Sequence, residues 1–324
     1  MLVDSYITYI GKIKRYSLRT VEIYSQVLRG YFEYTVGEKP DQLGHDGRWI
    51  GHEQVKRGMN SVQIRNYQVH LLDEKEMSAR TVCQHMSILS GFSKYLMTQK
   101  VLESNPVAGL SRPKQKKRLP EFYKEESMAD YLSRTEVYGS EDLSVPYENR
   151  LGRLVVLLLF SCGIRRSELI GLNISSLDRG RKCLRVHGKG DKIREIPLVD
   201  VLFKEILLYL DVVEAVICGE RQKGDSLLVR ESGEPLYPVL VDRIVKRELQ
   251  GVKGVTGKRS PHVLRHTLAT ELLNAGTDLN SIKELLGHSS LAATQVYTHN
   301  SIAKLKKVYQ TAHPRAKNGG KNGD

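Results

Sequence analysis

The chain has 324 residues, of which 40% are hydrophobic and 27% charged, and its formal net charge is +13. This composition argues against bulk disorder, and the length allows two domains. The longest apolar run, 154–160, is too short to span a membrane, and the four cysteines form no CxxC pair that would suggest a zinc site. We therefore expect a protein of the reducing cytoplasm without a secretory signal or a disulfide framework.

The charge is unevenly distributed along the chain. Basic residues outnumber acidic ones in 1–120 and again in 151–324, whereas acidic residues dominate 121–150. Basic surfaces often face nucleic acid, because neutralising phosphates releases counterions. The charge therefore favours a nucleic-acid-binding protein over a basic protein that is merely soluble.

Residues 1–104 are predicted to form a helical domain of about four helices. Apolar residues recur at i, i+3 and i+4 spacing after Ser17 and again after Ser78, and 61–72 is a third candidate. Residues 37–58 are rich in glycine and charge, so we expect a loop or small insertion there.

Residues 105–120 are predicted to be a linker between the domains. Prolines at 106, 113 and 120 disfavour a helix, and clustered like charges repel one another. The segment could follow a DNA backbone or could be a solvated tether. The basic residues that could touch DNA are Arg112, Lys114, Lys116, Lys117 and Arg118.

The second domain is predicted to cover 121–313, followed by a disordered tail over 314–324. It should be mainly helical, with a small antiparallel β-sheet built on a hairpin around a Gly-Lys-Gly turn. The expected strands are 183–187 and 193–198, and the expected helices are 149–162, 201–218, 239–249, 261–275 and 279–286.

Two pairs of residues could belong to a functional site, and the first of them suits a phosphate. His262 and Arg265 share one face in the first turn of a predicted helix, where free N–H groups and the helix dipole attract anions. Arg165 follows a helix and a glycine break, and Glu168 is placed to brace its guanidinium. Taken singly, each pair is also compatible with an ordinary surface location.

Three further residues could take part in chemistry. Lys189, at the hairpin tip, could reach into a groove and donate a proton; His288 directly follows a helix end, and Tyr297 lies nine residues later. The ordinary alternatives, without a role in chemistry, are a solvated lysine, a solvated loop histidine and a buried tyrosine. Residues 251–258 are not a phosphate-binding loop, because Arg259 stands where serine or threonine is required.

Taken together and in this order, these residues resemble the signature of the tyrosine recombinases, the phage-integrase family, and within it the Xer-type recombinases. Two features depart from that pattern: the insertion over 38–60 looks longer, and Arg166 replaces a small or apolar residue. The stretches that carry the resemblance are 162–172, 186–192, 260–270, 285–289 and 294–299.

The resemblance implies that Tyr297 attacks a DNA phosphodiester and forms a 3′-phosphotyrosyl link. That link preserves the phosphoester energy, so rejoining needs no ATP, and neither a cofactor nor a metal is expected. Arg165 and Arg265 would clamp the phosphate oxygens, with Glu168 holding Arg165.

The resemblance implies three further roles in the same reaction. Lys189 would act as general acid, His262 would assist proton transfer, and His288 would hydrogen-bond the phosphate. Such enzymes act on double-stranded DNA with paired half-sites, through a Holliday junction. The assembly would be a homotetramer, or a heterotetramer with a related recombinase, and 302–309 would dock on a neighbouring protomer.

The implied architecture is a two-domain clamp on DNA, with a helical core-binding domain over 1–104 and the catalytic domain over 121–313. Chromosome dimer resolution in the bacterial cytoplasm, at the nucleoid, is the first hypothesis, with a DNA translocase as a candidate accessory partner. The alternatives are integration, excision or inversion by a mobile element, a relaxing topoisomerase, and a catalytically silent DNA-binding regulator.

Overall fold

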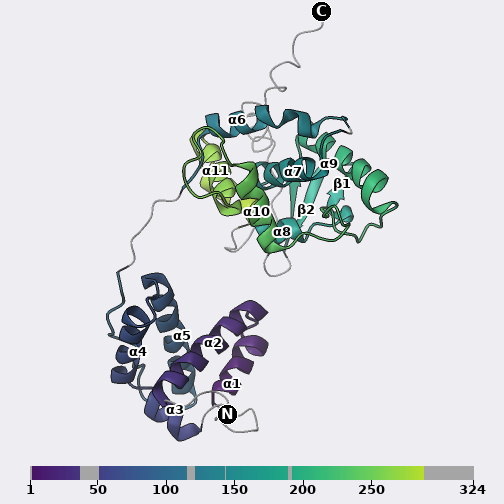
Figure 1. Ribbon diagram of the computed structural model, residues 1–324. Helices are drawn as coiled ribbons and strands as arrows, with labels where there is room; N and C mark the ends of the chain where they lie inside the picture. Colours follow the sequence, from purple (N-terminus) through teal and green to yellow (C-terminus); the bar gives the residue numbers. More distant parts are fainter. Residues whose placement is uncertain (1, 37–50, 115–120, 143, 189–191, 288–324) are drawn as a thin grey trace, which may run out of the picture. The chain divides into compact units, whose positions relative to one another are not determined.

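The structure is a computed structural model, and it describes residues 2–36, 51–114, 121–142, 144–188 and 192–287 (Figure 1). The chain divides into two compact units between Arg118 and Leu119. Among the described residues, no helix combines the length and apolar character needed to cross a membrane.

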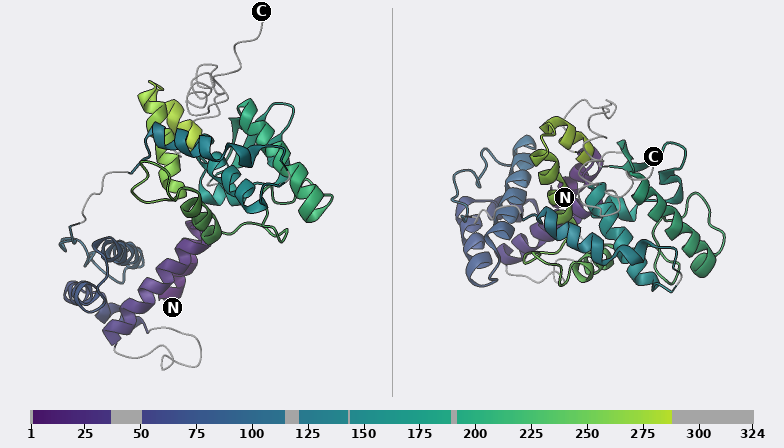
Figure 2. Two further views of the ribbon diagram at one scale, coloured as in Figure 1. Left: turned by 45° about the horizontal axis from the view of Figure 1, so that its top comes forward. Right: turned by 90° about the horizontal axis from the view of Figure 1, so that it is seen from above.

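The described part of the first unit is a bundle of α-helices, seen from further sides in Figure 2. Two helix starts follow from the sequence: the Asn60 side chain accepts hydrogen bonds from the N–H groups of Val62 and Gln63, and Ser78 caps the next helix through Thr81. The helices are α1 (Leu2–Thr8), α2 (Leu18–Val36), α3 (His52–Gly58), α4 (Ser61–Asp73) and α5 (Ala79–Thr98), with a π-helical turn over Tyr9–Ile13.

The core of this unit forms around α2, which contacts α1, α3, α4 and α5. Tyr31 and Phe32 of α2 are almost completely buried, and the Tyr31 hydroxyl donates to the Gly58 carbonyl at 2.6 Å. Beyond α5, Val107 is buried in the same core and Leu110 packs against it. The packed part of the unit therefore extends to about residue 110.

Helix α3 corrects one expectation, because 52–58 belong to a helix and not to a loop. Val55 is fully buried against the bundle, and the Gln54 side chain accepts a hydrogen bond from the Gly51 N–H at 2.9 Å. A seven-residue helix is marginal in isolation and is stabilised by tertiary packing. Because the segment is rich in charge and glycine, its sequence pattern did not predict this helix.

The second unit confirms the predicted mainly helical fold with a small antiparallel sheet. The predicted helices are present with ends shifted by a few residues, and α6 and α8 are additions. They are α6 (Glu125–Arg134), α7 (Tyr147–Ser161), α8 (Arg166–Ile170), α9 (Asp200–Val213), α10 (Pro238–Glu248), α11 (Pro261–Asn274) and α12 (Leu279–Leu286).

The sheet has the order β1-β2-β3 and is antiparallel throughout, with β1 (Leu177–Asp178), β2 (Cys183–His187) and β3 (Ile193–Pro197). His187 pairs with Ile193, and the Gly188 N–H donates to the Lys192 carbonyl at 2.7 Å, so the predicted hairpin is confirmed up to the base of its turn. Leu184, Val186 and Ile196 are buried on the face that joins the core.

Helix α7 organises the unit, since it contacts α8, α9, α10 and α11. In Figure 1 it lies in the middle of the unit, with α10 and α11 on one side and the sheet and α9 on the other. Its last residues are buried, and it ends before Gly163, whose φ of +56° turns the chain into α8. This turn brings Arg165 to the start of α8.

Candidate active site

Arg165 is held at the start of α8 by Glu168. One carboxylate oxygen of Glu168 accepts the backbone N–H of Arg165 at 2.8 Å, and the other accepts Nη1 at 2.6 Å. Nη2 of Arg165 donates to the carbonyl of Gly287 at 2.9 Å. The Arg165 side chain remains 31% exposed, so its guanidinium is fixed in orientation yet accessible to an anion.

Arg265 comes from the second turn of α11 and is buried. Its guanidinium donates to the carbonyls of Gly163 and Leu286. Burial, and next the charge of Arg165, lower its pKa to about 10, so it stays protonated at neutral pH. The two guanidiniums repel each other, and backbone carbonyls offset that repulsion.

The C-terminal end of α12 gathers three arginines. The consecutive carbonyls of Leu285, Leu286 and Gly287 accept from Arg194, Arg265 and Arg165, in that order. The last carbonyls of a helix lack partners within the helix and carry partial negative charge. The end of α12 therefore fixes a cluster of positive charge assembled from α8, β3 and α11.

Arg194 is a member of this cluster that the sequence analysis missed. Its Nη1 and Nη2 donate to the two oxygens of Glu168 at 3.1 and 2.7 Å. Burial alone would raise the pKa of Glu168, but hydrogen bonds from Arg194 and Arg165 lower it to about 2. A signal was present: strand alternation puts Arg194 on the same face as the buried Ile196, an unusual position for a charge.

His262 lies in the first turn of α11, and its side chain is exposed while Arg265 one turn later is buried. Partial burial, followed by the positive charge of Arg166, lowers the pKa of His262. Arg166 itself pairs with Asp242 of α10. A neutral imidazole at neutral pH can accept a proton.

The other predicted site residues, Lys189, His288 and Tyr297, lie outside the described residues. Their chain neighbours are informative: a Cβ atom on Gly188 would lie 3.9 Å from the Glu168 carboxylate, and the Gly287 carbonyl binds Arg165. Both neighbours therefore adjoin the arginine cluster.

Of the predicted DNA-contacting linker residues, Arg112 and Lys114 lie in the described part of the chain. Arg112 donates to the Ser87 hydroxyl at 3.1 Å. The others, Lys116, Lys117 and Arg118, lie outside it, as do 38–50 of the predicted insertion and the predicted docking segment 302–309.

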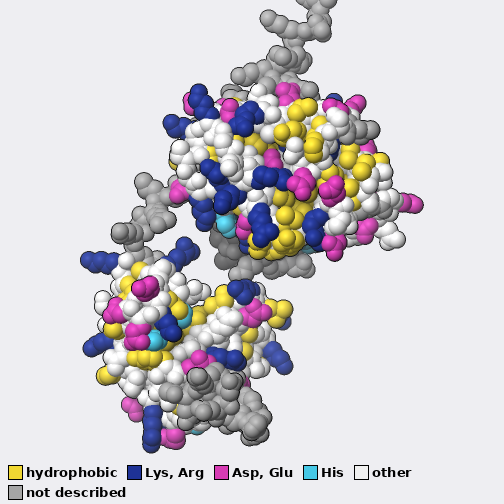
Figure 3. All heavy atoms as spheres, viewed as in Figure 1, with side chains coloured by type: hydrophobic (Ala, Val, Ile, Leu, Met, Phe, Trp, Pro, Cys, Tyr) yellow, Lys and Arg dark blue, Asp and Glu magenta, His cyan; other side chains and the backbone are white. Residues whose placement is uncertain are grey.

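Basic side chains gather on one face of the second unit, over α8, α10 and α11 (Figure 3). Arg243, Lys246 and Arg247 project from α10, and Lys253 and Lys258 follow in the loop before α11. The α10 residues are spaced i, i+3 and i+4, so they share one side of the helix. This spacing was a sequence signal for a basic surface near the site.

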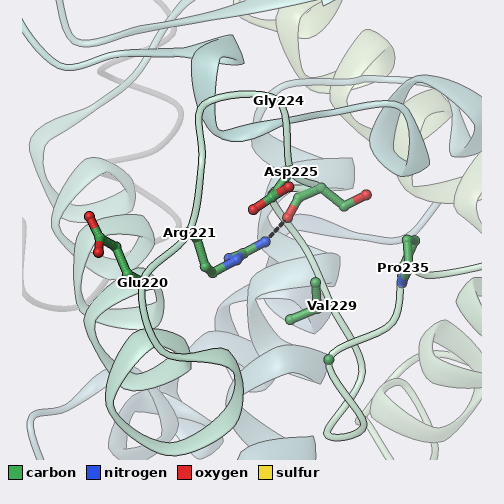
Figure 4. Close-up of a pocket in the computed structure, with 8 residues that line it drawn as sticks. Glu220, Arg221, Gly224, Asp225, Val229 and Pro235 are labelled. Atoms are coloured by element: carbon green, nitrogen blue, oxygen red, sulfur yellow. Dashed lines mark hydrogen bonds between the residues drawn. The ribbon is translucent and has the colours of Figure 1, made fainter.

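A pocket is lined by residues of the segment that connects the π-turn Glu214–Cys218 to α10, and none of the lining residues belongs to the arginine cluster (Figure 4). Arg221 donates to the carbonyl of Ser226, and Glu220 and Asp225 add acidic groups to the lining. Among the described residues, no group of three His, Cys, Asp or Glu side chains is placed to hold a metal ion.

Comparison with known proteins decides the family. Residues 146–304 match the phage integrase family. A tyrosine recombinase XerC of Bacillus pumilus is 33% identical over 97% of both chains, and one of Bacillus licheniformis is 34% identical over 96% of this chain and all of that one. The chain is a tyrosine recombinase of the phage integrase family.

Solved structures agree with this recombinase's fold. The integrase of the Tn1549 transposon, in complex with transposon right end DNA, superposes with a TM-score of 0.64 at 17% identity, over 95% of this chain and 98% of that one. The XerH recombinase bound to its difH substrate superposes with a TM-score of 0.61 at 19% identity, over 94% of this chain and 80% of that one. The predicted fold class is thereby confirmed. The match to the phage integrase family and to the XerC proteins confirms the predicted family, so this recombinase is an enzyme of site-specific DNA cleavage and rejoining.

Proposed function

We propose that this recombinase is of the Xer type and resolves chromosome dimers in the bacterial cytoplasm, at the nucleoid. The similarity to proteins named XerC over almost the full length of both chains supports this role over integration or inversion by a mobile element.

The observation that carries the proposed chemistry is the arginine cluster at the end of α12. Arg165 and Arg265 are held by backbone carbonyls and Glu168, so they need little reorganisation when a phosphate arrives. Negative charge builds on the non-bridging oxygens in the transition state, which fixed cations stabilise more than the ground state. Removing one such donor typically slows a reaction about 10²-fold or more.

In the proposed cleavage step the Tyr297 phenol oxygen bonds to phosphorus and the bond from phosphorus to the 5′-oxygen breaks. His262 helps to remove the phenol proton, and Lys189 gives a proton to the leaving 5′-oxygen. His288 hydrogen-bonds the phosphate. Support comes from the lowered pKa of His262 and from Gly188 and Gly287, which precede Lys189 and His288 and adjoin the cluster.

Duplex DNA is the proposed partner, gripped by the first unit as core-binding domain and by the catalytic unit. The basic side of α10 and the linker residues Arg112 and Lys114 are candidates for backbone contacts. Four protomers, alone or with a related recombinase, would act on paired half-sites, with a DNA translocase as accessory. The mirrored arms of such a site follow from the symmetry of the protomers.

The test begins with selection of bound DNA from a random pool, to obtain the recognition site. A nicked version of that site should then trap a covalent protein–DNA adduct that survives denaturant. Tyr297→Phe should bind the same DNA and form no adduct. A wild-type protein that binds the selected site without any adduct would instead support a silent DNA-binding regulator, and relaxation of supercoils without a site requirement would support a topoisomerase.

A further inference from the structure

We propose that Arg194 is a positioning residue for DNA cleavage, which sets the orientation of Arg165 through Glu168. The inference rests on the proposed function, since it concerns the same phosphate-binding cluster. Arg194 is on β3, whereas its two partners lie on other elements: Glu168 is on α8, and Leu285 is near the end of α12.

The contacts of Arg194 use its whole guanidinium. Nη1 and Nη2 donate to Glu168 at 3.1 and 2.7 Å, and Nε donates to the Leu285 carbonyl at 3.0 Å. The Arg194 side chain is 14% exposed and that of Glu168 is 4% exposed. A forked pair in such surroundings is directional and weakly screened. Arg194 therefore fixes the plane of the Glu168 carboxylate.

The Glu168 carboxylate transmits this orientation to Arg165. Its Oε1 accepts Nη1 of both Arg165 and Arg194, and its Oε2 accepts the Arg165 backbone N–H as well as Nη2 of Arg194. Without Arg194, the carboxylate would keep Arg165 as a partner but could rotate. A displacement of about 1 Å in a catalytic group can cost about 10²-fold in rate.

Arg194 also lies close to the two glycines at the edge of the cluster. A Cβ atom on Gly287 would be 3.0 Å from Nη1 of Arg194, and one on Gly188 would be 3.7 Å from the same atom. The guanidinium is thus packed between the hairpin base and the end of α12. Arg194 holds these elements together around Glu168 without needing to touch DNA.

The experiment compares single-turnover cleavage of two nicked substrates at saturating DNA. One carries the normal scissile phosphodiester, and the other carries a neutral methylphosphonate there. The methylphosphonate lacks one charged non-bridging oxygen, so its cleavage depends less on a well-placed Arg165. Each variant is assayed for DNA affinity and for its melting temperature as well.

On the phosphodiester, Arg194→Ala should be about 10²-fold slower than wild type, with unchanged DNA affinity, and Arg194→Lys should be intermediate because a lysine lacks the fork. On the methylphosphonate, the gap between wild type and either variant should shrink to within about threefold, as it should for Arg165→Ala. Should Arg194→Ala not fold, Arg194→Lys carries the same comparison. Arg185→Ala is the matched control: it removes an arginine with acidic partners from the neighbouring strand β2.

Three results would overturn the assignment. They are wild-type cleavage by both Arg194 variants, an equal loss on both substrates, and a loss explained by weaker DNA binding. Each of these leaves the proposed function standing, provided that wild type forms the adduct. Absence of any wild-type adduct would remove the proposed function and this inference together.

Discussion

The guanidinium of Arg265 donates a hydrogen bond to the backbone carbonyl of Gly163, which lies 102 residues earlier in the chain. Gly163 has a φ of +56°, and a Cβ atom there would lie 2.6 Å from Leu286 and 2.8 Å from Leu268. The turn that ends α7 and the support of Arg265, the arginine proposed to bind phosphate, are therefore the same structural feature.

Gly163→Ala should destabilise the second unit by about 3 kcal/mol, because it combines backbone strain with overpacking. Calorimetric melting should show the loss. Gly276→Ala is the matched control, since Gly276 has a φ of +76° at the end of α11 and a Cβ added there would meet no atom of the described residues within 4 Å. It should cost about 1 kcal/mol from strain alone. Equal losses in the two variants would contradict the packing argument.

Glu168→Gln should lower stability at pH 7 and slow cleavage about 10²-fold, because an amide cannot hold two guanidiniums. The folded-state pKa of Glu168, about 2, is depressed below its ordinary value. Its contribution to stability, about 2 kcal/mol after allowance for screening, is therefore present above about pH 4.5 and lost as the pH falls toward 2. The difference in melting temperature between wild type and variant should shrink over that window. Glu195→Gln, on the same strand as Arg194 but with a side chain that is 42% exposed, should behave like wild type.

Arg166→Ala should move the acid limb of the pH–rate profile for cleavage to higher pH. The charge of Arg166 helps to hold the pKa of His262 below its ordinary value, and the neutral imidazole is the form that accepts a proton. Removing that charge raises the pKa of His262, so the rate at the acid end of the pH range should fall. Asp242→Asn, which removes the partner of Arg166, should shift the limb the other way. Single-turnover rates from pH 5 to 8 measure both shifts. If the acid limb of the pH–rate profile does not move in one of the variants, the charge of Arg166 does not control His262.

Glu271→Gln should stabilise the protein in alkaline buffer. Both carboxylate oxygens of Glu271 are buried without a hydrogen-bond partner among the described residues, and burial, with Glu125 adding to it, raises its pKa to about 7. The protein therefore has its full stability below about pH 4.5, where Glu271 is protonated, and loses part of it as the pH rises through 7 and the buried carboxyl ionises. The variant should gain about 2 kcal/mol at pH 8.5 and little at pH 4.5, by calorimetry. The control is Glu284→Gln, at an exposed position of α12. A gain in stability that is equal at both pH values would contradict the raised pKa of Glu271.

Most of the fold was accessible from local sequence signals. Apolar spacing, the caps at Ser78 and Asp278, and the stop at Gly287 located helices to within a few residues. Helix α3 was not found, because its one fully buried apolar side chain, Val55, produces no periodic pattern.

For the site, the order and type of the residues that identify the family, from Arg165 to Tyr297, could be read from the chain alone, as could the pairing of Arg165 with Glu168 three residues later. That was possible because such motifs are local. The sharing of Glu168 between Arg194 and Arg165, and the three carbonyls at the end of α12 that hold three arginines, became visible in the folded molecule. These contacts join segments up to 122 residues apart, and the directions of side chains from distant elements are set by packing, which no local pattern encodes.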